Sequence, residues 1–230
     1  PSGAHSACAS SYETCSGRSR WGRHRRVRRG RAVTATARFA RRELILGGQK
    51  SGKSRRAEEL AADWLAADAG HQAVLIATAE AHDDEMRARI LRHQQDRALR
   101  VPALRTAHAP RDLAAALAAL SQADTLVVVD CLTLWLTHWL MPYAAEDSEP
   151  NKAPAPDWPA QKAHFFEALA GAAGPVVLVG NEIGLGVIPL GREVRQFVDA
   201  LGTLNQGVAA ACDRVTLMAA GLPLCLKGST

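Results

Sequence analysis

The sequence has no apolar run long enough to cross a membrane as a helix. Its longest mainly apolar stretch, residues 131–141, includes Thr133, Thr137 and His138 and falls well short of the roughly 18 residues that a spanning helix needs. No internal repeat is evident either. The hydrophobic fraction is 47% in 230 residues, which is ordinary for a globular protein and predicts a single domain.

Cysteine is scarce and shows no pairing pattern. The five cysteines are odd in number and form no Cys-x-x-Cys pair; they are Cys8, Cys15, Cys131, Cys212 and Cys225. This pattern indicates free thiols in a reducing compartment, and neither a zinc site nor a disulfide framework. We therefore expect a cytoplasmic protein.

The formal net charge of +5 by itself favours a nucleic-acid-binding protein. Residues 1–42, however, hold eleven Arg against the single acidic Glu13, which leaves 17 basic against 22 acidic residues in the remainder. A mildly acidic body argues against a nucleic-acid-binding core, although the basic segment remains suited to polyanions.

Residues 1–42 are rich in Arg, Ser, Gly and Ala and lack apolar periodicity, so we expect a disordered tail. Three interpretations compete. The Arg-rich, acid-poor composition resembles an organelle transit peptide, the run Arg23–Arg29 is suited to nucleic acid, and a misplaced start would add upstream sequence. We favour the misplaced start, because the segment begins with Pro1 and contains no Met.

From Glu43 onward strand-like and helix-like patterns alternate, which predicts one α/β domain over residues 43–230, with a mostly parallel central sheet flanked by helices. We expect strands over residues 44–46, 73–78, 125–130, 175–179 and 214–219, and helices over residues 54–69, 83–97, 110–120, 132–140, 161–170 and 192–212. Residues 141–160 contain five prolines and an acidic run, which predicts an exposed loop within the domain.

The strongest motif follows the first strand. Residues 47–54 read G-x-x-x-x-G-K-S between an apolar strand and an amphipathic helix, the context of a phosphate-binding loop. Glycines allow the backbone to approach phosphate oxygens, and the N–H groups at the helix start point at the anion. In such a loop Lys53 reaches the β and γ phosphates and the Ser54 hydroxyl binds Mg²⁺. The nucleotide contacts are thus expected from Gly47, Gly48, Gln49, Lys50, Ser51, Gly52, Lys53 and Ser54.

Two further features fit a nucleotide enzyme. Asp130 ends an apolar strand, where P-loop proteins place the second metal-binding side chain, although a strand-terminal Asp also serves to cap the next helix. Glu85, Arg89, His93 and Arg97 recur every four residues and so share one helix face. Arginines beside His93 favour its neutral, nucleophilic form, while a surface ion pair and a solvent-facing histidine remain the alternative interpretation.

A last segment, residues 181–189, follows the fourth expected strand and contains Gly184, Gly186 and Pro189. Ligands of doubly wound folds bind at the carboxyl edge of the sheet, where this loop would lie. From its residues alone, a tight structural connection is an equally good interpretation.

Taken together, these motifs resemble the bifunctional adenosylcobinamide kinase/adenosylcobinamide-phosphate guanylyltransferase family of cobalamin biosynthesis. The resemblance spans about Leu44 to Lys227. It is carried by residues 47–55, 76–79, 83–86, 130–133, 181–189 and 220–223, together with Arg89, Ile90, His93, Arg195, Phe197, Asp199, Gly202, Asn205 and Gln206.

The resemblance implies a RecA-like P-loop NTPase fold, commonly assembled as a homotrimer. It implies phosphorylation of adenosylcobinamide, a corrinoid, with ATP or GTP, followed by transfer of GMP from GTP to the new phosphate through a histidine-bound GMP. The guanylylated residue corresponds to His93, with Lys53 as the second catalytic residue and Mg²⁺ as cofactor on Ser54 and Asp130. Further nucleotide contacts correspond to Thr78, Ala79, Glu80, Gln94, Gln95, Asp96, Arg97, His108 and Asp130.

The sequence departs from the family pattern at two of these positions. His108 stands where the family usually has Glu, and Asp130 stands where Glu is frequent, which keeps the charge on a shorter side chain. Two alternative functions stay open at this point: a P-loop small-molecule kinase without guanylyl transfer, and a RecA-like nucleic-acid-dependent ATPase.

Overall fold

The structure, a computed structural model, describes residues 39–141 and 158–228. The tail prediction therefore lies almost entirely outside the described residues, as does most of the predicted loop over 141–160. Two details differ from those predictions. Arg42, which the prediction assigned to the tail, begins the first strand, and the helix predicted from residue 161 already begins at Trp158. Pro159 is tolerated there because the first helical turn makes no use of its missing N–H.

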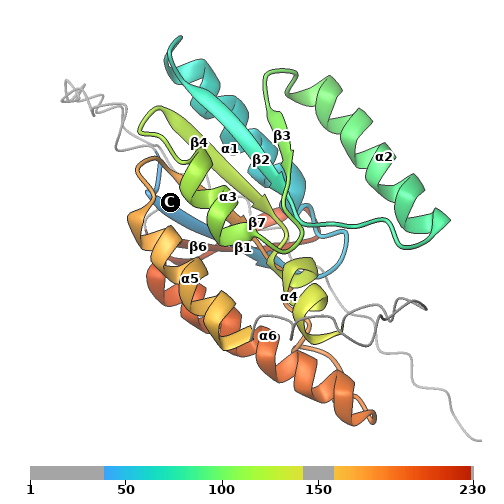
Figure 1. Cartoon of the computed structure of the whole chain (residues 1–230). Coiled ribbons are helices and arrows are strands. Elements are labelled where there is room, and N and C mark those ends of the chain that lie inside the picture. Colours follow the sequence, from blue (N-terminus) through green and yellow to red (C-terminus); the bar gives the residue numbers. More distant parts are fainter. Residues whose placement is uncertain (1–38, 142–157, 229–230) are drawn as a thin grey trace, which may run out of the picture. The chain divides into compact units, whose positions relative to one another are not determined.

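Within the described ranges, seven strands form one sheet in the order β3-β2-β4-β5-β1-β6-β7 (Figure 1). The strands are β1 (Arg42–Gly47), β2 (Gln72–Ala77), β3 (Arg105–His108), β4 (Thr125–Asp130), β5 (Val176–Val179), β6 (Arg214–Ala219) and β7 (Leu222–Lys227). The helices are α1 (Lys53–Ala67), α2 (Asp84–Arg100), α3 (Leu113–Leu120), α4 (Leu132–Leu140), α5 (Trp158–Gly171) and α6 (Arg192–Ala211). None of the described helices is long and apolar enough to span a membrane.

All neighbouring strands pair in parallel except β6 and β7, which form an antiparallel hairpin. The strand β5 lies between β1 and β4, so the P-loop strand and the Asp130 strand are two places apart. Parallel strands end at the same edge of the sheet, which brings the residues after β1, β2, β4 and β5 together. This arrangement confirms the predicted α/β fold with a mostly parallel central sheet.

The sheet is covered on both faces because successive residues of a buried strand point in opposite directions. Ile45 packs with α1 residues, including Leu60 and Trp64, on one face. Leu44 and Leu46 pack on the other face with residues of α3, α4, α5 and α6. The central strands are therefore apolar at nearly every position, which is why they were recognisable in the sequence.

The two edge strands β3 and β7 were missed by the sequence prediction. β3 spans four residues, of which three are exposed, so it gains hydrogen bonds from β2 and buries little apolar surface. β7 contains Pro223, which edge strands tolerate. Ala220 and Gly221, both at positive φ, form the tight turn that joins β6 to β7.

Candidate nucleotide-binding site

The P-loop connects the end of β1 to the start of α1, as predicted. Gly47 and Gly52 have φ values of 150° and 100°, which favour glycine. A Cβ on Gly47 would lie 2.4 Å from the carbonyl oxygen of Met218 on β6, so no side chain fits there. The turn after β6 also holds the loop, because the Gly221 N–H donates to the Ser51 carbonyl over 3.1 Å.

Two P-loop side chains are buried in the loop that they belong to. The Nζ atom of Lys53 donates to the Gly48 carbonyl over 2.6 Å, and burial lowers the pKa of its ammonium group, opposed by the neighbouring Cys131 and Asp130. Ser51 Oγ is buried and has no hydrogen-bond partner among the described residues. Buried polar atoms are nearly always hydrogen-bonded, so this hydroxyl is suited to an oxygen atom of a ligand.

Ser54 and Asp130 meet across the sheet. Burial raises the pKa of the Asp130 carboxyl group above its ordinary value, and a hydrogen bond with the Ser54 side chain is the main effect that opposes this rise. His93 and Arg97 also lower the pKa of the Asp130 carboxyl group, as Ser54 does, because a nearby positive charge favours the carboxylate. His93 and Arg97, on the predicted face of α2, thus interact electrostatically with Asp130, which is predicted to bind the metal together with Ser54.

The end of β2 is tied to the end of β4 through Thr78. The Thr78 hydroxyl donates to the Cys131 carbonyl over 2.7 Å and accepts from the Cys131 N–H over 2.9 Å. Thr78 is fully buried, and its hydroxyl is used inside the protein. In the sheet register, Ala77 is the partner of both Asp130 on β4 and His108 on β3, so His108 reaches the same edge and is exposed there.

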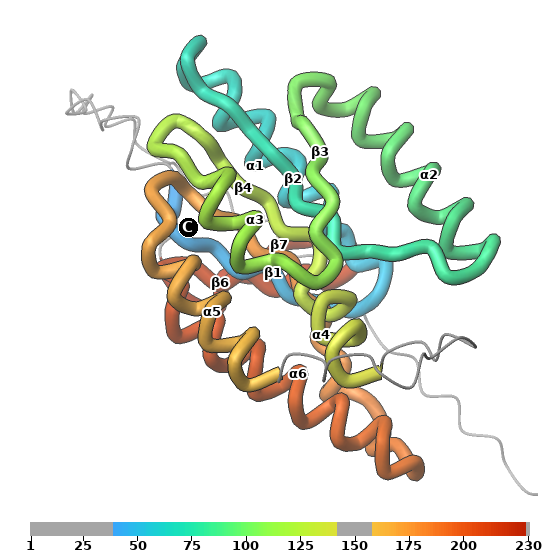
Figure 2. The backbone as a smooth tube through the Cα atoms, viewed as in Figure 1, coloured from blue at the N-terminus to red at the C-terminus, as the bar shows by residue number. Residues whose placement is uncertain are grey.

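Helix α2 lies outside the β3 edge of the sheet (Figure 1). Figure 2 shows the segment after β2 running away from the sheet before α2 returns alongside β3. Two contacts hold the C-terminal half of the helix. The Arg97 guanidinium donates to the Thr106 hydroxyl over 3.1 Å, and Arg100 Nε donates to Glu58 Oε2 of α1 over 2.7 Å.

Helix α2 continues to Arg100, three residues beyond its predicted end. Gln94, Gln95, Asp96 and Arg97 are therefore part of the same continuous helix as His93. His93, Gln95 and Asp96 are exposed, Gln94 is half-buried and Arg97 is buried. Arg97 alone of these predicted nucleotide contacts has its side chain in a described hydrogen bond, that with Thr106.

The loop over residues 181–190 lies beside the P-loop, as its position after β5 predicted. The Glu182 N–H donates to the Gly47 carbonyl over 3.1 Å. Thr133 Oγ1 accepts from the Asn181 N–H over 2.9 Å, which joins the loop to α4. The loop exposes large apolar side chains, with Leu185 81% and Val187 97% exposed.

Two features were not predicted from the sequence. One is the set of contacts that position α2, and the other is a group of side chains formed by Glu80, His82 and His138. Glu58, with a side chain that is 3% exposed, looked like an ordinary polar residue of an amphipathic helix. Its partner Arg100 lies 42 residues further along the chain. No sequence spacing links such residues, because the contact arises only when α1 and α2 are both in place.

The chain was compared with known proteins. Residues 43–226 match the sequence model of the cobinamide kinase / cobinamide phosphate guanyltransferase family. The chain belongs to this family. This confirms the predicted family and, with it, the enzyme class of bifunctional kinase and guanylyltransferase. Neither alternative function from the sequence describes this family.

Relatives among characterised proteins are bifunctional adenosylcobalamin biosynthesis proteins. CobP of Pseudomonas aeruginosa is 44% identical over 187 residues, covering 81% of this chain and 98% of the relative. CobU of Salmonella typhimurium is 35% identical over 192 residues, covering 80% of this chain and 98% of that relative. Among solved structures, flagellar accessory protein FlaH of Methanocaldococcus jannaschii is 12% identical with a TM-score of 0.43, covering 82% of this chain and 78% of that one.

Proposed function

We propose that this protein phosphorylates adenosylcobinamide with ATP or GTP and then transfers GMP from GTP to the resulting phosphate, releasing pyrophosphate. The site assignment is supported by the electrostatic coupling of Asp130 to Ser54 and Lys53, two residues of the P-loop. A hydroxyl and an ammonium group from the P-loop, together with a carboxylate from the end of β4, form a site for a metal–triphosphate. Family membership supplies the substrates.

The residues present fit Mg²⁺. Ser54 and Asp130 offer one hydroxyl and one carboxylate oxygen, and Mg²⁺ prefers oxygen ligands with most remaining positions left to water and phosphate. The pKa of Asp130 is raised because burial disfavours its charged form, and a bound cation would stabilise that charged form. When bound, Mg²⁺ would neutralise negative charge on the phosphates. Lys53 and the backbone N–H groups of Gly47–Ser54 hold the β and γ phosphates.

His93 is proposed as the covalent nucleophile. An imidazole nitrogen attacks the α phosphorus of GTP, a nitrogen–phosphorus bond forms, and the bond to the leaving pyrophosphate breaks. The phosphate oxygen of adenosylcobinamide phosphate then attacks the same phosphorus and releases the imidazole. What supports His93 is its exposed position on α2 together with its electrostatic coupling to Asp130. In this two-step route the two negatively charged substrates, GTP and adenosylcobinamide phosphate, never need to react directly with each other.

The remaining nucleotide contacts are proposed by position. Thr78, Ala79 and Glu80 follow β2 at the carboxyl edge of the sheet, and His108 ends β3 at the same edge. Gln94–Arg97 continue the helix that carries His93. We assign the base and ribose of the nucleotide to this side, because the P-loop occupies the opposite side of β4.

The decisive experiment is incubation with GTP labelled in the α phosphate, followed by peptide mapping. Wild-type protein should form an acid-labile adduct on the peptide that contains His93, and His93→Ala should form none while keeping part of its kinase activity. The matched control is His164→Ala, a replacement of an exposed histidine on α5. Labelled His93→Ala protein would show that the nucleophile is another residue, and an unlabelled wild type would favour a kinase without guanylyl transfer.

The assembly is proposed from the resemblance, and the location from the free-thiol pattern of the cysteines. We propose a homotrimer in the cytoplasm, with residues 43–230 as its catalytic domain. Exposed apolar side chains on β7, including Leu222 at 71%, support a protein contact at that edge of the sheet. Light scattering of the purified full chain measures the assembly directly, and a mass of one chain at micromolar concentration would contradict the trimer.

A further inference from the structure

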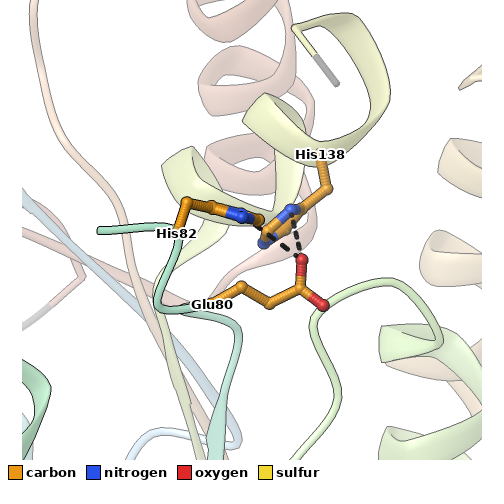
Figure 3. A group of neighbouring side chains, drawn as sticks. All are labelled: Glu80, His82 and His138. Atoms are coloured by element: carbon orange, nitrogen blue, oxygen red, sulfur yellow. Dashed lines mark ion pairs between the residues drawn. The ribbon is translucent and has the colours of Figure 1, made fainter. Parts of the chain in front are cut away.

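Three side chains next to the nucleotide site converge on one point (Figure 3). Glu80 and His82 lie in the segment between β2 and α2, and His138 lies in the last turn of α4. Their ligand-type atoms all lie within 4.8 Å of one another. Glu80 Oε2 is at the centre of the group, 3.3 Å from His138 Nδ1 and 3.5 Å from His82 Nε2.

The ring of His138 is oriented by a contact outside this group. Its Nε2 atom lies 2.8 Å from the carbonyl oxygen of Thr78. A carbonyl oxygen only accepts, so Nε2 carries the hydrogen and donates it. A histidine that gives one N–H to a backbone carbonyl and turns its other nitrogen toward a ligand set is the usual arrangement in metal sites.

This orientation leaves Nδ1 of His138 facing the carboxylate. In the neutral ring with its hydrogen on Nε2, Nδ1 is an acceptor, as is Glu80 Oε2 at 3.3 Å. Two acceptors at that distance repel unless a positive group lies between them. The side chain of His138 is only 8% exposed, so bulk water does not screen the pair fully.

The two imidazole rings lie side by side next to the one carboxylate. The rings of His82 and His138 have centroids only 5.9 Å apart. One divalent cation bound to all three side chains would satisfy the carboxylate and both rings together, because the three ligand atoms lie within 4.8 Å of one another.

We propose that Glu80, His82 and His138 bind one divalent transition-metal ion, with Zn²⁺ the best fit, separate from the nucleotide-bound Mg²⁺. For metal–ligand bonds of 2.0–2.1 Å, a tetrahedral site has ligand atoms about 3.3–3.4 Å apart. The two distances to Glu80 Oε2, 3.3 and 3.5 Å, are close to this spacing, and the ligand atoms of the two histidines lie within 4.8 Å of each other. Two imidazoles and one carboxylate select zinc-like ions, whereas Mg²⁺ prefers an all-oxygen set.

The site would leave one coordination position open. Zinc sites with three protein ligands and an open position bind a water molecule or a ligand atom, whereas closed structural sites use four protein ligands. The Thr78 carbonyl that orients His138 belongs to the residue whose hydroxyl is bonded to Cys131, the neighbour of Asp130. The proposed metal therefore lies close to the nucleotide site. Its fourth coordination position would be open to water or to a donor atom of a substrate.

The test uses the full chain after removal of metals with a chelator. Titration with Co²⁺ should give visible absorption typical of a low-coordinate site, with one ion per chain, and Zn²⁺ should displace that ion while excess Mg²⁺ should not. His82→Ala removes one proposed ligand, on a partly exposed loop residue. It should weaken metal binding by at least about 10- to 100-fold, because even the loss of a residue that only hydrogen-bonds to a metal ligand has an effect of that size. Glu80→Gln should do the same.

The control is His164→Ala, which removes an exposed histidine from α5 and should leave the Co²⁺ spectrum unchanged. His138→Asn is the complementary variant, and its circular dichroism spectrum and Tm establish that it folds before its metal affinity is measured. Binding that is equal in wild type and His82→Ala would assign the ion to other residues and overturn the proposal. So would a wild type that binds neither Co²⁺ nor Zn²⁺ at millimolar concentration.

Discussion

Ser54, in the first turn of α1, lowers the pKa of Asp130 at the end of β4 and so opposes the rise that burial causes. The two residues interact across β5, which separates β1 from β4 in the sheet. The interaction links the phosphate-binding loop to the Asp130 carboxyl group, so the protonation of Asp130 is expected to affect both the proposed metal site and the stability of the fold.

Asp130→Asn should make the metal-free protein more stable and the enzyme nearly inactive. Burial raises the pKa of Asp130, so the folded state binds the proton more tightly than the unfolded state does. The stability gained from this proton is complete below the unfolded pKa and is lost as pH rises through the folded value. Asn keeps the neutral form at all pH values, and Tm at pH 8 should rise by about 2–4 °C for each kcal/mol regained.

Thermal unfolding at pH 8 and pH 5 measures this effect, and the gain in Tm should be smaller at pH 5. Mg²⁺-dependent kinase activity of the same variant should fall about 100-fold or more, because the metal loses a charged ligand. A lower Tm at pH 8, or activity near that of wild type, would contradict the assigned role of Asp130. Ser54→Ala is the companion variant and should lose activity without the gain in stability.

Arg100→Ala should impair guanylylation of His93 more than nucleotide binding. Arg100 joins α2 to the buried carboxylate of Glu58 on α1 over 2.7 Å, and α2 has few other anchors. Without the arginine, the helix that carries His93 is held less firmly relative to the P-loop, and we expect labelling from α-labelled GTP to slow about tenfold.

The control is Arg87→Ala, which removes an exposed ion pair with Asp84 on the same helix and should leave labelling unchanged. Nucleotide affinity, measured by calorimetry, should stay within about twofold of wild type in both variants because the P-loop is intact. Equal labelling rates for wild type and Arg100→Ala would mean that α2 is positioned by other contacts.

Arg42→Ala should destabilise the fold strongly. The buried Arg42 guanidinium donates to the carbonyl oxygens of Leu169 and Ala172 at the end of α5, and to those of Gly174 and Arg41. Its removal takes away four hydrogen bonds, including those to the buried carbonyl groups of Leu169 and Gly174, so urea denaturation should show a loss of at least about 3 kcal/mol. Arg41→Ala is the matched control with an exposed arginine, and a similar loss in both variants would contradict this account.

Cys131 and Cys212 should resist alkylation at pH 8 in the folded protein. Burial raises the pKa of the Cys131 thiol to about 11 and that of the Cys212 thiol to about 12, so almost no thiolate is present at pH 8. Among the three cysteines in residues 39–141 and 158–228, Cys225 is partly exposed and should react first. Mass spectrometry of peptides alkylated before and after denaturation checks the order, and labelling of folded Cys131 as fast as Cys225 would contradict it.

Features that depend only on residues close together in the chain could be predicted from the sequence. The P-loop, the apolar central strands and the amphipathic helices each carry a local pattern, because a buried strand or a helix face repeats its apolar residues at a fixed period. Asp130 was recognisable because it ends such a strand. His93 was placed on a helix face with Arg89 and Arg97 by the spacing of four residues.

Which of these features lie next to each other could be seen only once the chain was folded. The tertiary structure placed β5 between the P-loop strand and the Asp130 strand, and it added two edge strands, the short and mostly polar β3 and the proline-containing β7, which pair with only one neighbour each. It also brought His138 to Glu80 and His82, and Arg100 to Glu58. These contacts join residues far apart in the chain, and no local period encodes them, because they exist only after the sheet and helices have packed.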